Sequence, residues 1–156
     1  MKIAIASDHV GLELKQGIIN YFNDIGVEYH DFGTFTSQRC NYPEFALKAA
    51  LAVTSGEFEK GLLFCGTGVG ISIAANKVKG IRCVVCSEPY SASLSRRHND
   101  TNMLAIGSRV VGLDLAIMIV QSWLSEKFEG GRHSVRVEQI SQIESFGEIT
   151  SLTSLK

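Results

Sequence analysis

Short apolar runs alternate with segments of helical periodicity along most of the chain. The apolar runs predict five strands, at residues 2–7, 27–32, 62–65, 81–86 and 102–107. Apolar residues at helical spacing predict helices at residues 12–25, 42–54, 89–98, 111–127 and 135–146, and a further helix that ends near residue 78. The strands are short and rich in Val, Ile, Leu and Ala, which is typical of a parallel sheet covered by helices on both faces. The pattern therefore predicts an α/β fold.

Local signals indicate where some of these elements end and which sides they bury. Gly26 is expected to end the first helix, and Pro43 and Pro89 occupy tolerated first-turn positions. The alternation at residues 27–32 is weak, which indicates an edge strand. The helix at residues 111–127 is expected to bury one apolar side, made of Leu113, Ala116, Ile117, Val120 and Leu124. The apolar residues of the last helix are Val135, Ile140 and Ile143.

Composition narrows the class of protein. The chain has 156 residues and a formal net charge of −1, which gives no support to a nucleic-acid partner. No apolar run reaches the roughly 20 residues of a membrane span, and the first residues turn polar too soon for a signal peptide. A cytoplasmic protein with no membrane partner is expected. No linker or repeat divides the sequence, so we expect one domain over residues 1–147 and a frayed polar tail at 148–156.

Polar and glycine residues gather where the predicted strands end. In doubly covered parallel sheets, ligands bind beyond the carboxyl ends of the strands. The residues at these ends are Asp8-His9, Cys65-Gly66, Ser87-Glu88 and Gly107-Ser108-Arg109. This edge of the sheet is therefore the expected place for a ligand site.

The most informative stretch joins a strand to a helix through alternate glycines. Cys65 ends the strand, and Gly66-Thr67-Gly68-Val69-Gly70 follows it. Glycines let a backbone come close to a ligand, and the following helix would direct free N–H groups at an anion. Ile71 stands where a dinucleotide fingerprint needs its third glycine, and the Lys-Ser/Thr of a P-loop is missing. A loop that binds a small oxyanion or sugar oxygens is the better interpretation.

Other candidate groups each have a plain structural alternative. Cys65 is either a buried thiol or a thiolate that acts as nucleophile or base, favoured by the helix terminus. His98 ends a helix, where a histidine often only complements the helix dipole. Arg132 and Arg136 would share one helix face, which suits a phosphate or is simply a solvated basic face.

The remaining cysteines give no metal signal. Cys83 and Cys86 are expected to point to opposite faces of a strand, as small apolar residues. The sequence offers no second Cys pair at zinc spacing and no His/Cys cluster. No metal is therefore predicted.

Long motifs in this chain closely resemble the type B ribose-5-phosphate isomerases, a family that includes the galactose-6-phosphate isomerase subunits. The resemblance covers residues 1 to about 143. It is carried by Asp8-His9-Val10-Gly11, the stretch from Cys65 to Lys77, Ser87-Glu88-Pro89-Tyr90-Ser91-Ala92, Arg97-His98-Asn99-Asp100-Thr101-Asn102 and Gly130-Gly131-Arg132-His133. Some branches of the family carry a glutamate base just beyond the cysteine. Residues 71–74 contain no acid here, so the chain resembles the cysteine branch.

The resemblance implies a Rossmann-like α/β/α sandwich with a five-stranded parallel sheet. It implies isomerisation of ribose 5-phosphate and ribulose 5-phosphate, without metal or organic cofactor, in a homodimer or homotetramer whose active sites are shared between subunits. Cys65 matches the catalytic base and His98 the residue that opens the sugar ring. Sugar and phosphate contacts match Asp8, His9, Tyr42, Gly66, Thr67, Gly68, Val69, Gly70, Asn99, Arg109, Arg132 and Arg136.

Two other functions stay open on the sequence. One is an allose-6-phosphate or galactose-6-phosphate isomerase of the same family, because pocket depth is not visible in the sequence. The other is a non-catalytic sugar-phosphate-binding module, against which the joint presence of Cys65 and His98 argues.

Overall fold

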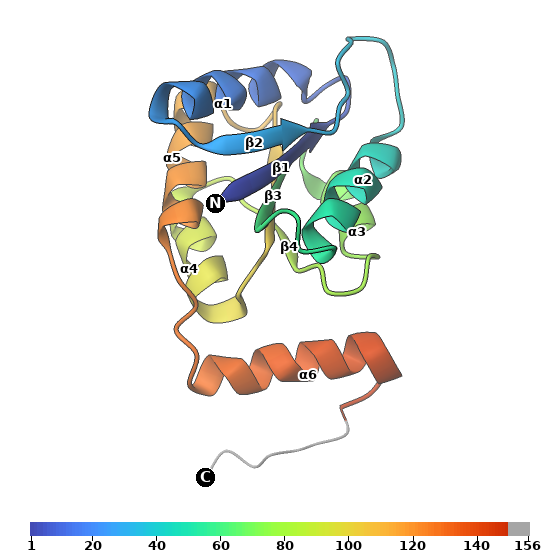
Figure 1. The fold of residues 1–156 in the computed structure, drawn as a ribbon, viewed down its shortest axis with the longest axis vertical. Coiled ribbons are helices and arrows are strands. Elements are labelled where there is room, and N and C mark those ends of the chain that lie inside the picture. The colour runs from blue at the N-terminus through green and yellow to red at the C-terminus, as the bar shows by residue number, and fades with distance from the viewer. Residues whose placement is uncertain (150–156) are drawn as a thin grey trace.

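The computed structural model describes residues 1–149, which form a three-layer α/β/α sandwich (Figure 1). A five-stranded parallel sheet with the order β2-β1-β3-β5-β4 makes the central layer. The strands are β1 (Lys2–Ser7), β2 (Glu28–Asp31), β3 (Lys60–Cys65), β4 (Cys83–Val85) and β5 (Met103–Gly107). The helices are α1 (Leu12–Ile25), α2 (Tyr42–Thr54), α3 (Val69–Ala75), α4 (Pro89–Asn99), α5 (Leu113–Ser125) and α6 (Arg132–Phe146).

Two apolar cores lie on the two faces of the sheet. Alternate residues of β1 supply them, with Ile3 and Ile5 on one face and Ala4 and Ala6 on the other. The first core packs under α1, α4 and α5, and the second packs under α2 and α3. Cys65 belongs to the second core, so its side chain points toward the α2 and α3 layer.

Several predicted boundaries are confirmed. The first strand and the first two helices have the predicted limits, and Gly26 ends α1 in the left-handed conformation at φ 71°. The strand predicted at 27–32 is an edge strand, β2, as expected. Cys83 and Cys86 contribute to opposite cores, and both thiols are free. Among the described residues, no helix is both long and apolar enough to cross a membrane.

Some predictions were wrong in extent. β3 begins at Lys60 and β4 covers only three residues, whereas the helix expected to reach residue 78 ends at Ala75. The last helix begins at Arg132 rather than at residue 135, directly after Gly131. The predicted tail falls mostly outside the described residues.

The predicted apolar side of α5 was right in part. Ala116 and Val120 are fully buried, and Ile117 and Leu124 pack against the core, but Leu113 is 42% exposed. The prediction missed Ile119 and Trp123, which are fully buried, because α5 carries apolar residues almost all round. Trp123 marks the buried side, since its indole N–H donates to Thr101 Oγ1 at 2.9 Å.

A buried lysine holds the segment after β2 against the sheet. Lys15 of α1 is fully buried, and its Nζ lies 2.7 Å from Asp31 Oδ2 and donates to the Thr34 carbonyl at 2.6 Å. The backbone N–H of Thr34 donates to the Ser7 carbonyl at the end of β1. The pair therefore fixes the loop that passes the carboxyl end of β1.

Removing one partner of this pair should destabilise the fold strongly. Asp31→Ala leaves the ammonium of Lys15 buried with a single oxygen partner, at a cost of about 3–5 kcal/mol. Glu57→Ala is the matched control, because the Lys2–Glu57 pair at 3.6 Å is exposed. That change should cost less than about 1 kcal/mol. Urea unfolding measures both, and equal losses would contradict the role given to Lys15.

Candidate active site

Cys65 ends β3 with its sulfur held by the loop that follows. The side chain is 5% exposed, and Sγ accepts the backbone N–H of Gly68 at 3.1 Å. A hydrogen bond to a thiolate is stronger than one to a thiol, so this donor stabilises negative charge on the sulfur. The sulfur of Cys65 therefore has a backbone donor within hydrogen-bond distance.

Two glycines allow the loop to pack against the end of β5. Gly68 has φ 79°, a conformation that L side chains rarely adopt. A Cβ at Gly107 would lie 2.7 Å from the Thr67 carbonyl carbon, so only glycine fits there. The position of the Gly68 N–H therefore depends on both residues.

The glycine stretch is shorter as a loop than its sequence suggested. α3 has seven residues and starts at Val69, so Val69 and Gly70 belong to its first turn. Tyr42, at the start of α2, lies against this turn, because a Cβ at Gly70 would be 2.7 Å from Tyr42 Cζ. The structure therefore brings Tyr42 to the glycine stretch, next to Cys65.

Asp8 and His9 follow β1 at the same edge. Asp8 is buried, and its Oδ1 accepts the N–H groups of Val10 and Gly11 at 2.9 Å, which shapes the turn into α1. His9 Nδ1 accepts the backbone N–H of Cys40 at 3.3 Å. The proton of a neutral His9 is therefore on Nε2, which is left as a donor for a ligand. Sequence reasoning missed Cys40, which lies in a loop without periodicity.

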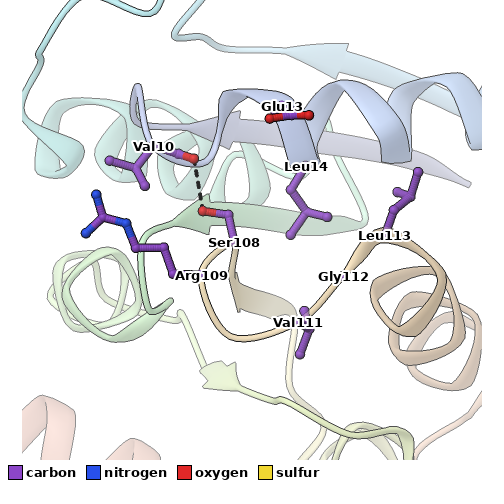
Figure 2. A pocket seen from close by; sticks show the side chains of 8 residues that line it. All are labelled: Val10, Glu13, Leu14, Ser108, Arg109, Val111, Gly112 and Leu113. Carbon is purple, nitrogen blue, oxygen red and sulfur yellow. Dashed lines mark hydrogen bonds between the residues drawn. The ribbon is translucent and has the colours of Figure 1, made fainter.

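Arg109 extends beside a cleft of about 340 Å³ at this edge (Figure 2). Its backbone N–H donates to the Gly66 carbonyl at 3.0 Å. Ser108 Oγ donates to the Val10 carbonyl at 2.9 Å and ties the β5–α5 connection to the start of α1. The cleft opens between α1 and α5, and Cys65 is not among its lining residues. The guanidinium of Arg109 nevertheless lies close to the glycine loop, within 3.9 Å of where a Gly66 Cβ would be.

The other four candidates lie at the opposite edge of the sheet. α4 starts beyond the end of β4 and runs back, so His98 and Asn99 at its end lie near the start of β5. α6 lies along this amino edge, where Gly80 N–H donates to both carboxylate oxygens of Glu144 at 3.0 Å (Figure 1). Arg132 and Arg136, in the first turns of α6, therefore lie at the same edge as His98.

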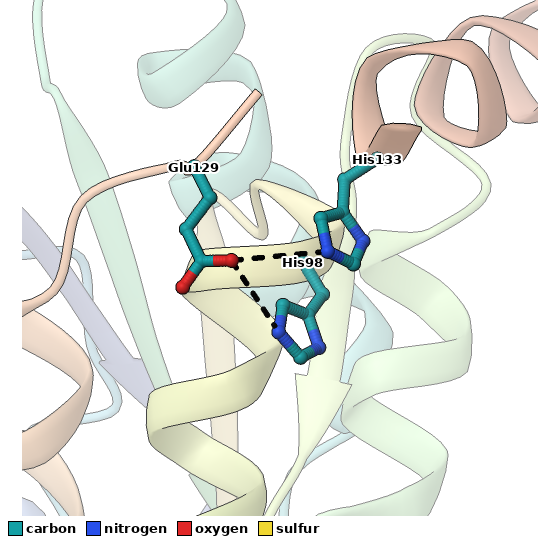
Figure 3. A group of neighbouring side chains, drawn as sticks. All are labelled: His98, Glu129 and His133. Carbon is teal, nitrogen blue, oxygen red and sulfur yellow. Dashed lines mark ion pairs between the residues drawn. The ribbon is translucent and has the colours of Figure 1, made fainter. Parts of the chain in front are cut away.

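His98 is part of a compact charged group that the sequence did not reveal. Its ring stacks on His133, with centroids 4.2 Å apart and planes at 3° (Figure 3). Glu129 Oε2 lies 3.7 Å from His98 Nε2 and 3.8 Å from His133 Nε2. The only sequence signal was the spacing of Glu129 and His133, four residues apart across two glycines. We call His98, Glu129 and His133 the imidazole–carboxylate cluster.

The two histidines of the cluster differ in their surroundings. Burial lowers the pKa of His133, and the charges of His98, Arg132 and Arg136 lower it further, with only Glu129 opposing. Hydrogen bonding by Arg97 holds the pKa of Glu129 below its usual value. The cluster is thus a neutral imidazole, an ionised carboxylate and the partly exposed ring of His98.

The cluster also has the donor types of a zinc site, which the sequence had not indicated. Its three donor atoms lie within 4.8 Å of one another. Arg97 is bonded to the carboxylate, and the charges of Arg132 and Arg136 act on His133. These guanidinium groups oppose a divalent cation and favour an anion. The absence of a metal stays a prediction.

One chain does not bring the two groups of candidates together. Asp8, His9, Tyr42, Arg109 and the stretch from Cys65 to Gly70 lie at the carboxyl edge, while His98, Asn99, Arg132 and Arg136 lie at the amino edge. β3 has six residues, and a parallel strand rises about 3.3 Å per residue, so the edges are about 17 Å apart. A single sugar therefore does not reach Cys65 and His98 of the same chain.

Comparison with known proteins relates this arrangement to a family. A family model described as Ribose/Galactose Isomerase matches residues 3–140. The chain belongs to this family. Ribose-5-phosphate isomerase B of Escherichia coli (strain K12) is 62% identical over 143 residues, which cover 92% of this chain and 96% of that protein. The resemblance found in the sequence is confirmed.

Solved structures of the isomerase family agree. Ribose-5-phosphate isomerase B of Clostridium thermocellum matches with a TM-score of 0.92 and 55% identity, over 93% of this chain and 98% of that chain. Ribose-5-phosphate isomerase B of Mycoplasma genitalium, solved with bound ribulose-5-phosphate, matches with a TM-score of 0.88 and 38% identity, over 93% and 97%. The Rossmann-like fold class is therefore also confirmed.

Displacing the Gly68 donor in this isomerase-family site should lower turnover. Gly68→Ala places an L side chain at positive φ, with its Cβ 3.1 Å from Val85 Cγ1, and moves the N–H away from Cys65. We expect kcat to fall about tenfold or more, because donors to a developing charge are worth that much. Gly112→Ala is the control, since its Cβ would meet nothing within 4 Å. Equal kcat values for the two variants in a sugar-phosphate isomerase assay would show that the Gly68 donor is dispensable.

Proposed function

We propose that this protein interconverts ribose 5-phosphate and ribulose 5-phosphate through an enediolate. Family membership supports the reaction class, and the Escherichia coli relative at 62% identity carries the name of this activity. The observation that carries the chemistry is the buried Cys65 thiol with the Gly68 N–H at its sulfur. A pure binding module needs no such proton acceptor.

Cys65 is the proposed base of the isomerisation. Its thiolate takes the proton from C2 of the open-chain aldose, that C–H electron pair forms the C1–C2 double bond, and the carbonyl pair moves onto O1. The sulfur then returns the proton to C1, while the O2 proton moves to O1 and leaves C2 as the carbonyl. Backbone N–H groups of the Gly66–Gly70 stretch are the proposed donors to the charged oxygen.

His98 is the proposed acid for the preceding step, which opens the furanose. The bond between C1 and the ring oxygen O4 breaks, and its electron pair stays on O4. O4 receives a proton from His98, and the O1 proton leaves to water. Imidazole suits this exchange because it gains and loses protons near neutral pH.

Arginines are the proposed phosphate ligands. Arg132 and Arg136 lie one turn apart on α6 and are exposed, so their guanidinium groups are free to bind an anion. Arg109 at the carboxyl edge offers a third guanidinium. The other proposed sugar or phosphate contacts are Asp8, His9 and Tyr42 at the carboxyl edge and Asn99 at the amino edge. Holding the phosphate fixes the reacting carbons over the sulfur, which removes much of the entropic cost of the reaction.

The active site is proposed to form between two copies of the chain, in a homodimer or a dimer of dimers. The separation of the edges supports this, since Cys65 of one copy needs His98 of another. α6 also leaves large apolar side chains uncovered, with Ile140 45%, Ile143 50% and Phe146 69% exposed. Such side chains are typical of a surface that another chain covers. We further propose a cytoplasmic location and one functional domain over residues 1–147, with no cofactor.

Cys65→Ala should strongly reduce isomerisation. Loss of a general base costs about 10²- to 10⁴-fold in rate, so conversion of ribose 5-phosphate should fall by that amount. Cys83→Ala is the control, because burial raises the pKa of the Cys83 thiol far above neutrality. In D₂O the unchanged protein should also introduce deuterium at C1 of ribulose 5-phosphate. Full turnover by Cys65→Ala would exclude this thiol as the base.

Mixing two inactive variants should restore activity if the sites are shared. Cys65→Ala and His98→Ala each damage every site of their own homodimer. Random reassortment after mild denaturation gives mixed dimers in which one of two sites is intact, so about a quarter of the wild-type activity should return. Sites built within single chains would give no recovery, and that outcome would overturn the shared site but not the isomerase activity.

The choice of sugar is tested by comparing substrates side by side. We expect ribose 5-phosphate to have the higher kcat/KM and allose 6-phosphate, which is one carbon longer, to be the poorer substrate. A preference for the hexose phosphate would retain the mechanism and change the proposed substrate.

A further inference from the structure

Glu129 Oε2 faces both stacked imidazoles, at 3.7 Å from His98 Nε2 and 3.8 Å from His133 Nε2. Arg132 Nε donates to His133 Nε2 at 3.4 Å, so that nitrogen is an acceptor and carries no proton. His133 is also buried, and its lowered pKa keeps it neutral. His133 therefore does not compete for the carboxylate, and the Glu129 oxygen that faces both rings is left for His98 Nε2.

The carboxylate is itself held in place from two sides. Arg97 Nε donates to Glu129 Oε1 at 2.6 Å, and Arg97 Nη2 lies 2.5 Å from the same oxygen. The backbone N–H of Glu129 donates to the Arg97 carbonyl at 3.0 Å. These contacts occupy Oε1 and aim Oε2 at the stacked rings (Figure 3).

Ring stacking also restrains the orientation of the His98 imidazole. His133 stacks on one face of the ring with nearly parallel planes, and this stack limits rotation of the imidazole. With Nε2 facing Glu129 at 3.7 Å, the second nitrogen, Nδ1, is on the other side of the ring. The side chain of His98 is 31% exposed, so part of the ring is open to a ligand.

We propose that Glu129 is a positioning residue for ring opening, which keeps a proton on His98 Nε2 and presents Nδ1 to the sugar ring oxygen. This inference rests on the proposed isomerase function. The carboxylate stabilises the imidazolium through its charge, and the His133 platform keeps the ring in the orientation in which Nδ1–H donates. Ring opening then consumes the proton at Nδ1, and Nε2 keeps its proton throughout. Glu129 does not touch the sugar.

The substrate pair allows ring opening to be separated from enolisation. Ribose 5-phosphate is cyclic, whereas ribulose 5-phosphate has its C5 oxygen esterified and stays open. Exchange of the C1 hydrogen of ribulose 5-phosphate with D₂O therefore reports on Cys65 without ring opening. Conversion of ribose 5-phosphate requires both steps.

Glu129→Gln should damage only the first step. Glutamine preserves the size of the side chain and an oxygen for Arg97, but removes the charge. At pH 7.5 we expect conversion of ribose 5-phosphate to fall about tenfold, because general acid catalysis contributes 10²- to 10⁴-fold and is only weakened here. Deuterium exchange into ribulose 5-phosphate should stay within about twofold of wild type, as for ordinary surface changes.

Two reference variants calibrate this result. His98→Ala should show the same split with a larger loss, and Glu126→Gln should change neither rate. Glu126 lies on the same connection before α6 and accepts a hydrogen bond from Ser93 at 2.9 Å, outside the cluster. Equal losses of conversion and exchange in Glu129→Gln would make the residue merely structural. Unchanged conversion of ribose 5-phosphate by Glu129→Gln would show that Glu129 has no role in ring opening.

An NMR titration of the His98 imidazole gives a readout that does not need turnover. The charged groups around the stacked rings are Glu129, and Arg132 and Arg136 from α6, and Arg97 from α4 is bonded to Glu129. Without the carboxylate an imidazolium at His98 loses the negative charge of Glu129, so its ring should be easier to deprotonate in Glu129→Gln than in the wild type. The loss of conversion relative to the wild type should then grow as the pH rises.

The two possible failures are distinguishable. If the wild-type protein does not convert ribose 5-phosphate, the proposed function is wrong, and the NMR titration still decides whether Glu129 acts on His98. If the wild type is active and the pKa of His98 is unchanged or higher in Glu129→Gln, the proposed role of Glu129 is overturned and the isomerase function stands.

Discussion

The common direction of the five strands determines which functional groups of one chain are neighbours. Because every strand runs the same way, each connecting helix must return across the sheet, and residues at a helix start and a helix end lie at opposite edges. Cys65 and the glycine stretch follow a strand, whereas His98 ends a helix. The backbone hydrogen-bond ladder thus separates the proposed base from the proposed acid before any side chain is considered.

The two edges are built by different kinds of interaction. At the carboxyl edge, backbone N–H groups donate hydrogen bonds to the side chains of Cys65 and Asp8, and glycines allow the backbone to come close. The Cys65 side chain also packs in the apolar core. At the amino edge, side-chain charges are arranged around one another, and Arg97 and Glu129 are the central pair. The first arrangement suits a developing charge on a sulfur or an enolate oxygen. The second suits a phosphate and a proton that comes and goes.

Features of the fold that depend on neighbouring residues were predictable from the sequence. Features that depend on contacts between distant segments were not. The limits of α1 and α2 followed from Gly26 and Pro43, which act within their own turn. The buried side of α5 followed only in part, because its apolar residues surround the helix and contact with the sheet decides which of them are buried. Cys65 was recognisable from its place before alternate glycines. Glu129 was not recognisable, because its partner His98 lies 31 residues earlier and no sequence motif in either segment indicates the contact. The expectation of a shared site came from family resemblance, and strand direction supplies a physical argument for that proposal.

The placement of α6 along the amino edge has a consequence for newly made protein. In the proposed arrangement a folded chain holds the thiol at one end and the acid that opens the sugar ring at the other. Conversion of the cyclic sugar then begins only at assembly, because an unassembled chain does not bring both groups to one sugar. Pairing would serve as the last step of enzyme maturation, and the amount of active enzyme would rise more steeply than the amount of chain.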